Sequence, residues 1–301
     1  MQTAAFRGEL EKLLADDVPH GDLTTEALGI GGLHGEMVFT ARDALVLAEV
    51  ESAVALLEIA GCRVSPKARS GERLAPGAAI LIAEGTAAAL HRGWKVAQTL
   101  IEVWSGVATA ARAIVDAATA ISPHVVVACT RKNMPGTKSF AVRAIRAGGA
   151  VVHRLGLSES VLVFPEHRTF LASEPLDETV NRLRGAAPEK KLVIEANSIA
   201  DAVAAAEAGF DVIQAEKFSP QQLAGLVGEL ARLIRRPLIA AAGGITADNA
   251  SAYAQAGADI LVTSSPYLAR PRDVQVRFAP AACRSVAPAD TYPANSGVRN
   301  A

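Results

Sequence analysis

The second half of the chain alternates short apolar runs with amphipathic segments, and this alternation limits the possible folds more than any other feature. Six apolar runs have the length and composition of buried strands: residues 125–130, 161–166, 192–197, 211–216, 237–244 and 259–265. Helical patterns between them include residues 137–149, 198–210, 219–230 and 246–258. Strand–helix–strand units with short links give parallel strands with crossover helices. Because many such units follow one another without a G-x-G-x-x-G motif, we predict a closed α/β barrel.

The first half of the chain has a different sequence pattern, in which strand-like segments lie on both sides of one short helical segment. Residues 36–42 and 78–85 are strand-like, whereas residues 49–61 follow a helical pattern and stop at a glycine. Mixed strands and helices of this kind indicate an α+β unit of modest size.

A long helical pattern at residues 90–120 connects the two halves. Its apolar face consists of residues at helical spacing, namely Ala97, Leu100, Ile101 and Trp104. Gly106 lies in the middle of the pattern, and we expect it to break or bend the helix.

These patterns predict an α/β protein with four parts along the chain. The parts are an N-terminal α+β open-sandwich domain with the long helix (1–105), an α/β-barrel catalytic domain (106–270), a C-terminal return segment that packs on the N-terminal domain (271–286) and a disordered tail (287–301). A chain of 301 residues is long enough for a barrel and a smaller domain.

Charge and composition exclude several classes of protein. The 30 Lys and Arg residues balance 31 Asp and Glu, so the chain lacks the basic excess typical of nucleic-acid and membrane-surface binders. No apolar run reaches the roughly 18 residues of a membrane helix, and the charged amphipathic start has no signal-peptide core. We therefore expect a cytoplasmic protein that binds neither nucleic acid nor membrane.

Polar residues follow the apolar runs at the point where each run ends. They are Thr130, Arg131, Lys132, His153, Arg154, Glu195, Asn197, Glu216, Lys217, Thr246, Ser264 and Ser265, and the small-residue turn Gly243-Gly244-Ile245 lies at the same kind of position. Any one of them alone would more often be a solvated or structural residue. In an α/β barrel, however, the carboxyl ends of the strands meet at one face and carry the chemistry. Their shared position therefore predicts a site for a polyanion at the barrel mouth.

Residues 241–249, AAGGITADN, add a predicted phosphate-binding element. Two glycines after a strand, with Thr246 at a helix start, would expose backbone N–H groups at the positive end of a helix. A glycine pair is also common in ordinary barrel links. Ser264 and Ser265 at the end of the next strand strengthen the phosphate interpretation.

The carboxylates among these residues predict a magnesium site. The six histidines form no cluster with zinc-like spacing. Glu195 and Glu216 suit Mg²⁺, which proteins hold through a few carboxylates and the phosphates of the substrate. One alternative chemistry is an aldolase-like reaction, in which Lys132 or Lys217 would form a Schiff base.

Several motifs together resemble the nicotinate-nucleotide pyrophosphorylase (quinolinate phosphoribosyltransferase) family over nearly the whole chain, and most of all its ModD branch, which is encoded beside molybdate-transport genes. The motifs are GDLTTEAL (21–28), GERLAPG (71–77), WSGVAT (104–109), TRKNMPGTK (130–138), GGAVVHRLGLSESVLV (148–163), FSP (218–220) and AAGGIT (241–246). The resemblance implies a homodimeric pentosyltransferase. Such an enzyme would use phosphoribosyl pyrophosphate and Mg²⁺ to phosphoribosylate a pyridine carboxylate, with release of pyrophosphate.

The resemblance also assigns roles to residues of this chain. Lys132 would contact phosphoribosyl pyrophosphate, and Glu195 and Glu216 would lie near the ribose and Mg²⁺, with Glu216 in place of a family aspartate. The acceptor-binding residues would be Thr130, Arg131, His153, Arg154, Phe164 and, from the partner subunit, Lys95. The residues around the 5′-phosphate would be Ala242, Gly243, Gly244, Ser264 and Ser265.

Three positions depart from the quinolinate enzymes. Phe164 stands in place of a lysine, Glu166 in place of an asparagine, and Lys95 in place of an arginine. One cation fewer and one carboxylate more disfavour a dicarboxylate, and lysine does not reproduce the bidentate grip of arginine. Phe164 suits a flat, less charged ring, so we expect an acceptor other than quinolinate.

Three hypotheses follow from the sequence. The first is a Mg²⁺-dependent phosphoribosyltransferase that acts on a heterocyclic acid. The second is the Schiff-base aldolase, which the adjacent Arg131 and the two phosphate-binding loops disfavour. The third is a sensor, linked to molybdenum uptake, that binds a phosphoribosyl ligand without turnover. The sequence does not identify the acceptor or say whether decarboxylation accompanies the transfer.

Overall fold

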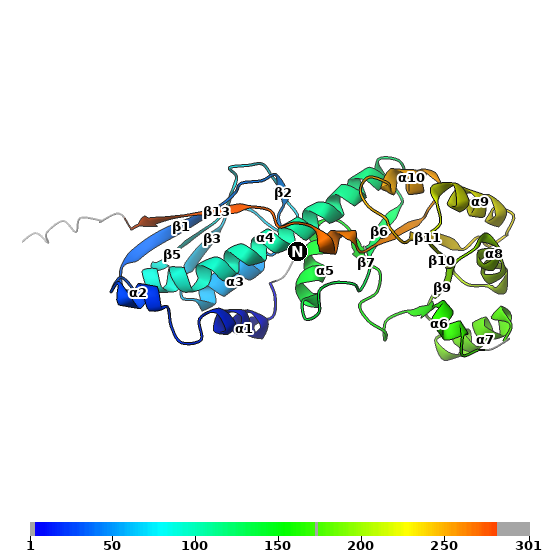
Figure 1. Ribbon diagram of the computed structural model, residues 1–301, viewed down its shortest axis with the longest axis horizontal. Coiled ribbons are helices and arrows are strands. Elements are labelled where there is room, and N and C mark those ends of the chain that lie inside the picture. The colour runs from blue at the N-terminus through cyan, green and yellow to red at the C-terminus, as the bar shows by residue number, and fades with distance from the viewer. Residues whose placement is uncertain (1–3, 172–173, 282–301) are drawn as a thin grey trace, which may run out of the picture.

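The computed structural model describes residues 4–171 and 174–281, which form an elongated molecule with two domains connected by one long helix (Figure 1). The predicted tail at residues 287–301 lies outside the described residues, as does the end of the predicted return segment beyond residue 281. Within the described ranges, no helix is both long and apolar enough to cross a membrane.

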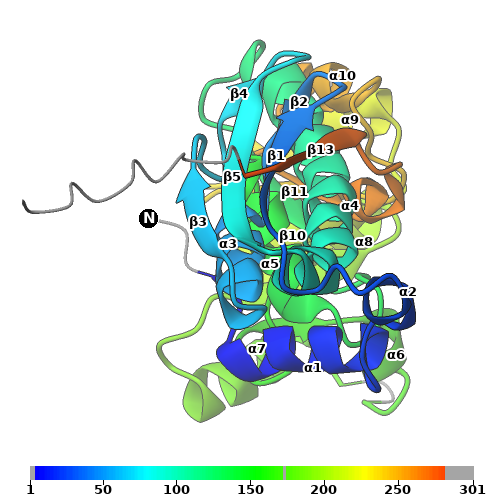
Figure 2. The ribbon, with the colours of Figure 1, turned by 90° about the vertical axis from the view of Figure 1, so that its left-hand side faces the viewer.

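The N-terminal domain is the predicted α+β unit. Its elements are α1 (Arg7–Asp17), α2 (Leu23–Ala27), β1 (His34–Ala41), β2 (Leu45–Val46), α3 (Val50–Ile59), β3 (Arg63–Pro66), β4 (Arg73–Leu74), β5 (Ala79–Thr86) and α4 (Ala87–Thr119). An antiparallel sheet has the order β13-β1-β5-β3, in which β13 (Val274–Pro280) comes from the return segment, and β2 pairs with β4. Strand alternation buries Met37 and Phe39 on the sheet face that α3 and α4 cover (Figure 2).

Helix α4 continues from one domain into the other, and the expected break at Gly106 is wrong. The helix is unbroken from Ala87 to Thr119. A Cβ atom at Gly106 would lie 2.3 Å from the carbonyl oxygen of Arg270. The glycine therefore allows the backbone of the return segment to cross α4 closely.

The second domain is built on a parallel sheet. Its elements are β6 (Val126–Cys129), α5 (Lys138–Ala147), β7 (Val151–Val152), β8 (Val161–Val163), α6 (Pro165–Arg168), α7 (Leu176–Ala186), β9 (Leu192–Ala196), α8 (Ile199–Ala208), β10 (Val212–Glu216), α9 (Pro220–Leu230), β11 (Leu238–Ala242), α10 (Ala250–Gln255), β12 (Ile260–Thr263) and the 3₁₀ helix η1 (Ser265–Leu268). The strand order is β7-β6-β12-β11-β10-β9-β8.

The barrel-type sheet is confirmed, but its predicted closure is wrong. Strands β7 and β8 follow each other in the chain yet form the two opposite edges of the sheet. The connection between them, residues 153–160, contains no helix. Within residues 4–171 and 174–281, no ladder joins these two edges, where β7 has only 2 residues and β8 only 3, so the sheet curls without closing.

Side-chain alternation along the strands separates a buried outer face from the inside of the curl. Ile194, Ile213 and Ile239 point outward and are fully buried under the helices. The residues that alternate with these isoleucines along each strand point inward. Among them, the register pairs Gln214 on β10 with Glu195 on β9. The same alternation carries Glu216 and its partner Ala242 to the inner face at the carboxyl ends of β10 and β11.

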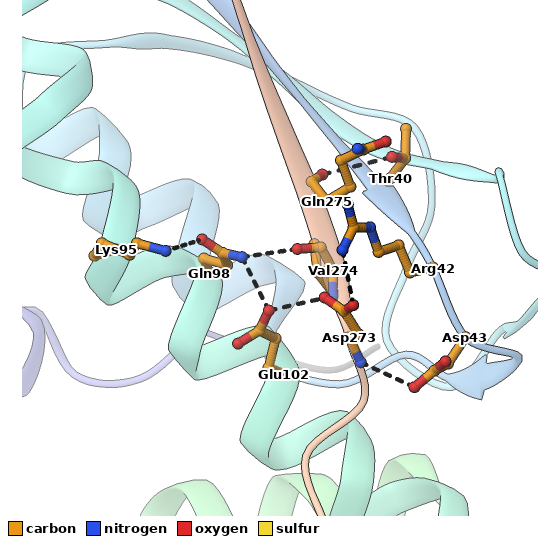
Figure 3. A network of polar contacts seen from close by, with 9 residues as sticks. All are labelled: Thr40, Arg42, Asp43, Lys95, Gln98, Glu102, Asp273, Val274 and Gln275. Atoms are coloured by element: carbon orange, nitrogen blue, oxygen red, sulfur yellow. Dashed lines mark hydrogen bonds and ion pairs between the residues drawn. The ribbon is translucent and has the colours of Figure 1, made fainter.

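The return segment connects the end of the barrel to the N-terminal sheet. Strand β13 pairs antiparallel with β1 along residues 274–280 and 35–41. Figure 3 shows the polar network at this junction, in which Gln98 on α4 donates to the carbonyl oxygen of Val274 at 2.7 Å. The backbone N–H of Val274 donates in turn to Glu102 on α4.

Candidate active site

A cavity of about 810 Å³ opens at the carboxyl ends of the barrel strands. Two of the residues that the sequence predicted for the site, Lys95 and the exposed Asn197, do not line it. The predicted residues that do line it include Thr130, Arg131, Lys132, His153, Arg154, Phe164, Glu195, Glu216, Ala242, Gly243, Gly244, Ser264 and Ser265. Glu166, Gln214, Lys217, Thr246 and Leu268 also line this main cavity. The structure therefore brings the predicted residues together, while their individual roles stay predictions.

One wall of the main cavity is acidic. Burial, followed by the nearby carboxylates of Glu216 and Glu166, raises the pKa of Glu195 despite a hydrogen bond from Gln214 and the charge of Lys132. Gln214 donates from Nε2 to Glu195 Oε2 at 3.0 Å. Its own Oε1 is buried without a hydrogen-bond partner. Such an orphaned acceptor beside crowded carboxylates is a place where a cation or a hydroxyl donor would be stabilised.

Gln214 is a site residue that the sequence analysis missed. It lies two positions before Glu216 on the same strand, so the period of two places both side chains on the inner face. A glutamine inside an otherwise apolar strand was the signal that could have identified it.

The opposite wall is cationic. Burial first, and then the charge of Arg131, lowers the pKa of Arg154. Burial and the neighbouring Arg154 also lower the pKa of His153, which favours the neutral imidazole near pH 7. The backbone N–H of His153 donates to the carbonyl oxygen of Cys129 at 2.9 Å and fixes this residue beside the end of β6. An acidic group of a ligand would find two guanidinium groups and a neutral imidazole here.

Phe164 supplies a flat apolar surface between the two walls. The guanidinium of Arg154 lies over its ring at 5.4 Å, and the ring of His167 stacks on it at 5.8 Å with an interplanar angle of 15°. His167 also accepts a hydrogen bond at Nδ1 from the backbone N–H of Phe164, at 2.9 Å. These contacts hold the phenyl ring in one orientation.

The predicted phosphate-binding loop follows β11. Gly243 and Gly244 have φ values of 90° and 79°, which favour glycine. A Cβ atom at Gly243 would lie 2.7 Å from Cγ of Lys217. Residue 217 itself has a φ of 57°, a strained conformation for a lysine that lines a cavity.

The expected helix start at Thr246 is wrong, because α10 begins at Ala250. The side-chain oxygen of Asn249 accepts the backbone N–H of Thr246 at 2.9 Å, so residues 246–249 form a turn. Thr263 connects this loop to the loop of Ser264 and Ser265. Its hydroxyl donates to the carbonyl oxygen of Ile245 at 2.7 Å and accepts from the backbone N–H of Ser265.

Lys95 lies on α4, outside the main cavity of its own chain. Its ammonium donates to Gln98 Oε1 at 3.1 Å (Figure 3). It also lies 4.6 Å from the ring centre of Trp94. The predicted contribution of Lys95 to a partner's site stays a prediction.

No group of three or more His, Cys, Asp or Glu side chains able to hold a metal ion occurs in the part of the chain that the structure describes. A metal ion in the main cavity would therefore need ligands from a bound substrate as well as from Glu195 and Glu216.

Solved structures with this architecture include a NadC protein and a nicotinate-nucleotide pyrophosphorylase. The fold matches NadC from Streptococcus pyogenes with a TM-score of 0.83 and 25% sequence identity, over 91% of this chain and 96% of that one. It also matches the nicotinate-nucleotide pyrophosphorylase of Ehrlichia chaffeensis with a TM-score of 0.82 at 20% identity, over 92% of this chain and 100% of that one. The chain therefore has the two-domain fold of these solved structures.

Both domains of one family match the sequence. The N-terminal domain of quinolinate phosphoribosyl transferase matches residues 22–105, and its C-terminal domain matches residues 107–277. The chain belongs to the quinolinate phosphoribosyltransferase family. It is 48% identical to the "Putative pyrophosphorylase ModD" of Rhodobacter capsulatus, over 82% of this chain and 95% of the relative. It is 31% identical to the "Probable nicotinate-nucleotide pyrophosphorylase [carboxylating]" of Archaeoglobus fulgidus, over 83% of this chain and 94% of the relative.

Proposed function

We propose that this protein is a Mg²⁺-dependent phosphoribosyltransferase that transfers phosphoribose from phosphoribosyl pyrophosphate to a ring nitrogen of a heterocyclic acid other than quinolinate. The main cavity carries the proposal, because one space holds a cationic wall, an acidic wall and a glycine–serine floor. A doubly phosphorylated sugar and an aromatic acid need these three surfaces. Family membership favours this reaction over the Schiff-base aldolase.

The chemistry requires no covalent nucleophile from the protein. The anomeric carbon loses its bond to pyrophosphate, whose oxygen keeps the bonding electrons, while a lone pair of the ring nitrogen forms the new bond. The ribose becomes cation-like during the transfer. Glu195 and Glu216 would stabilise this positive charge, and Lys132 would stabilise the negative charge that gathers on the leaving pyrophosphate.

The acidic wall fits Mg²⁺. Repulsion from Glu216 contributes to the raised pKa of Glu195, and a cation placed between the two carboxylates would relieve this repulsion. Bound Mg²⁺ would supply charge neutralisation for the pyrophosphate group. Removing one carboxylate, as in Glu195→Gln, should weaken phosphoribosyl pyrophosphate binding in the presence of Mg²⁺ more than in its absence.

The acceptor is proposed to be an aromatic acid with fewer negative groups than quinolinate. Phe164 offers a ring surface where a cation would be needed for a second carboxylate, and Glu166 adds a negative charge near it. An anion next to Glu166 would be destabilised, while an aromatic ring would stack on Phe164.

A homodimer is proposed as the active unit. An apolar cavity of about 730 Å³ lies beside Lys95 and includes Leu100, Trp104 and Met134. Met134 belongs to the loop that follows the cationic residues of the site, and its side chain is 70% exposed. A second copy that covers this surface would bury apolar area and bring its Lys95 toward the site.

Pyrophosphate release from phosphoribosyl pyrophosphate and Mg²⁺ tests the proposed reaction, with quinolinate, nicotinate and other heterocyclic acids as acceptors. We expect release with at least one monocarboxylate, and Lys132→Ala should lower kcat/KM by about 100-fold or more. Lys190→Ala is the matched control, because Lys190 precedes β9 at the opposite end of the barrel strands. Tight phosphoribosyl pyrophosphate binding without release for any acid would refute the enzyme and support a ligand sensor.

Mixing two inactive variants tests the shared site. In a heterodimer of Lys95→Ala and Lys132→Ala, one of the two sites would contain both lysines. Random reassociation should therefore restore about one quarter of the wild-type activity. No recovery in a mixture shown to contain heterodimers would refute the contribution of Lys95 from a partner.

A further inference from the structure

A second cavity of about 330 Å³ lies beside the main cavity, and we call it the side cavity. Arg131 and Arg154 line both cavities, so these two guanidinium groups form a shared wall. Most other residues of the side cavity come from the loop and helix after β6 and from the loop after β7, and they include Lys138 and Leu155; Val152 of β7 and Tyr267 of η1 complete the lining. Its volume exceeds what a single carboxylate group would fill.

The charge of the side cavity is entirely positive among the described residues that line it. Arg131, Lys138 and Arg154 contribute three cations, and no acidic side chain belongs to the lining. Glu159, an acid close by in the sequence, accepts a hydrogen bond from the backbone N–H of Leu155. The main cavity differs, because Glu166, Glu195 and Glu216 offset its cations. An uncompensated cluster of cations in a cavity attracts an anionic group.

Lys138 occupies an unfavourable position for a lysine. It is the first residue of α5, and no acidic residue occurs in the first turn of this helix. The positive end of a helix dipole favours an acid and disfavours a cation at this point. The N-cap residue, Thr137, donates its hydroxyl to the carbonyl oxygen of Met134 and makes no side-chain cap. A bound anion would compensate both the ammonium and the helix end.

Gly156 leaves space for that anion. A Cβ atom at Gly156 would lie 3.9 Å from Nζ of Lys138, so the ammonium faces a position without a side chain. Lys138 makes no ion pair with any other residue that the structure describes. Its charge is therefore available to a ligand.

The shared wall connects the side cavity to the aromatic surface of the main cavity. Arg154 lies over the ring of Phe164 on one side and lines the side cavity on the other. A ring placed near Phe164 would thus have the guanidinium of Arg154 beside it, and Arg154 also borders the side cavity that contains Lys138.

We propose that the side cavity binds an anionic tail of the acceptor, an inference that rests on the proposed transferase function. The acceptor is then a heteroaromatic acid whose carboxylate is separated from the ring by a short spacer. Its ring lies against Phe164, and its carboxylate passes between Arg131 and Arg154 to Lys138. This arrangement keeps the anion away from Glu166 and leaves the ring nitrogen on the side of the phosphoribosyl group.

A series of pyridine acids with increasing spacers tests the inference by calorimetry. The ligands are pyridine-3-carboxylate, pyridine-3-acetate, pyridine-3-propanoate and pyridine-3-butanoate. We expect the homologue that reaches Lys138 to bind about tenfold more tightly than pyridine-3-carboxylate, as a charge-assisted hydrogen bond would give. Lys138→Met should remove this gain and leave the binding of pyridine-3-carboxylate within about twofold of wild type. Lys190→Met is the control and should retain the gain.

A second variant tests whether the space at Gly156 is needed for binding, without changing the charge of the side cavity. Residue 156 is not among the glycines with positive φ, so Gly156→Val is compatible with the backbone. It should selectively weaken the longer homologues. Equal affinity for all four acids in the wild type, or equal weakening of all four by Lys138→Met, would overturn the proposal.

Pyrophosphate release with the same acids separates this proposal from the proposed function. Binding that depends on spacer length, with no release from any acid, would support the side cavity and refute the transferase. Release with pyridine-3-carboxylate, together with no dependence of affinity on spacer length, would support the transferase and overturn the side cavity.

Discussion

Replacing Arg143 by leucine should destabilise the fold strongly, because it removes the partner of a buried carboxylate. Arg143 on α5 donates from Nε to Glu49 Oε1 at 2.8 Å. The Glu49 side chain is 0% exposed and that of Arg143 is 16% exposed. Glu49 also accepts a hydrogen bond from the hydroxyl of Ser52. The variant leaves this carboxylate in the core with the hydroxyl of Ser52 as its remaining hydrogen-bond partner among the described residues.

The expected loss of unfolding free energy in Arg143→Leu follows from two energetic costs. Removing one partner of a buried ion pair costs about 3 to 5 kcal/mol. Glu49 can instead take up a proton, which at pH 7 costs about 3.7 kcal/mol for a glutamate whose ordinary pKa is near 4.3. Burial already raises the pKa of Glu49 in the wild type, more than Arg143 lowers it, so part of this cost is already present. We therefore expect a loss of about 2 to 3 kcal/mol at pH 7.

Urea unfolding at pH 7.5 and pH 5.5 measures both the loss and its pH dependence. A carboxyl group with a raised pKa in the folded state contributes stability at low pH, and this stability is lost as the pH rises through the folded value. Without Arg143 the folded pKa of Glu49 rises further, so the stability difference between variant and wild type should shrink at pH 5.5. A difference that is equal at both pH values would refute the reasoning.

The exposed pair of Arg232 and Glu207 supplies the control. Their side chains are 56% and 54% exposed at a distance of 3.0 Å. Arg232→Leu should change the free energy of unfolding by less than about 1 kcal/mol. A loss as large as that of Arg143→Leu would mean that removal of any arginine, rather than burial of its partner, is responsible.

Two further predictions concern close packing and titration. Gly106→Ala should destabilise by about 2 kcal/mol in urea unfolding, since its Cβ would collide with the carbonyl oxygen of Arg270, whereas Gly185→Ala, with nothing within 4 Å, should be neutral or stabilising. No loss in Gly106→Ala would contradict the close crossing. His153 should titrate below pH 6.5 in NMR spectra, because burial and Arg154 lower its pKa. Protonation of His153 then costs stability below that pH, and His153→Gln should lessen the acid-induced loss; an unchanged loss would contradict this origin.

The sequence predicted the sheet and the rim of the main cavity because both depend on local periodicity. Alternating side chains along β9 and β10 place Glu195 and Glu216 inside the curl whatever the details of the loops. The family resemblance of TRKNMPGTK and VVHRLGL added the expected roles. Gln214 was missed because it carries no charge. Its spacing of two residues from Glu216 nevertheless predicts that it lies on the same inner face.

The closure of the sheet and the path of α4 could not be predicted in the same way. Closure depends on whether the two edge strands β7 and β8 pair with each other, which the pattern within each strand does not show. Gly106 was expected to break a helix, because the sequence alone does not reveal the backbone of Arg270 against it. The first error concerns two consecutive strands that do not pair, and the second a contact between residues 106 and 270; local periodicity reveals neither.

The buried pair of Glu49 and Arg143 connects the N-terminal domain to the cationic wall of the site. Helix α5 begins at Lys138, directly after the loop that carries Arg131, and Arg143 lies one and a half turns further along it. Glu49 precedes α3 with a φ of 60°, a conformation that glutamate rarely adopts and that the surrounding contacts must maintain. The hydroxyl of Tyr267 meanwhile donates to the carbonyl oxygen of Thr130 at 2.9 Å. The loop between β6 and α5 is thus held at both ends. The positions of Arg131 and Lys132 on this loop therefore depend on contacts outside the barrel sheet.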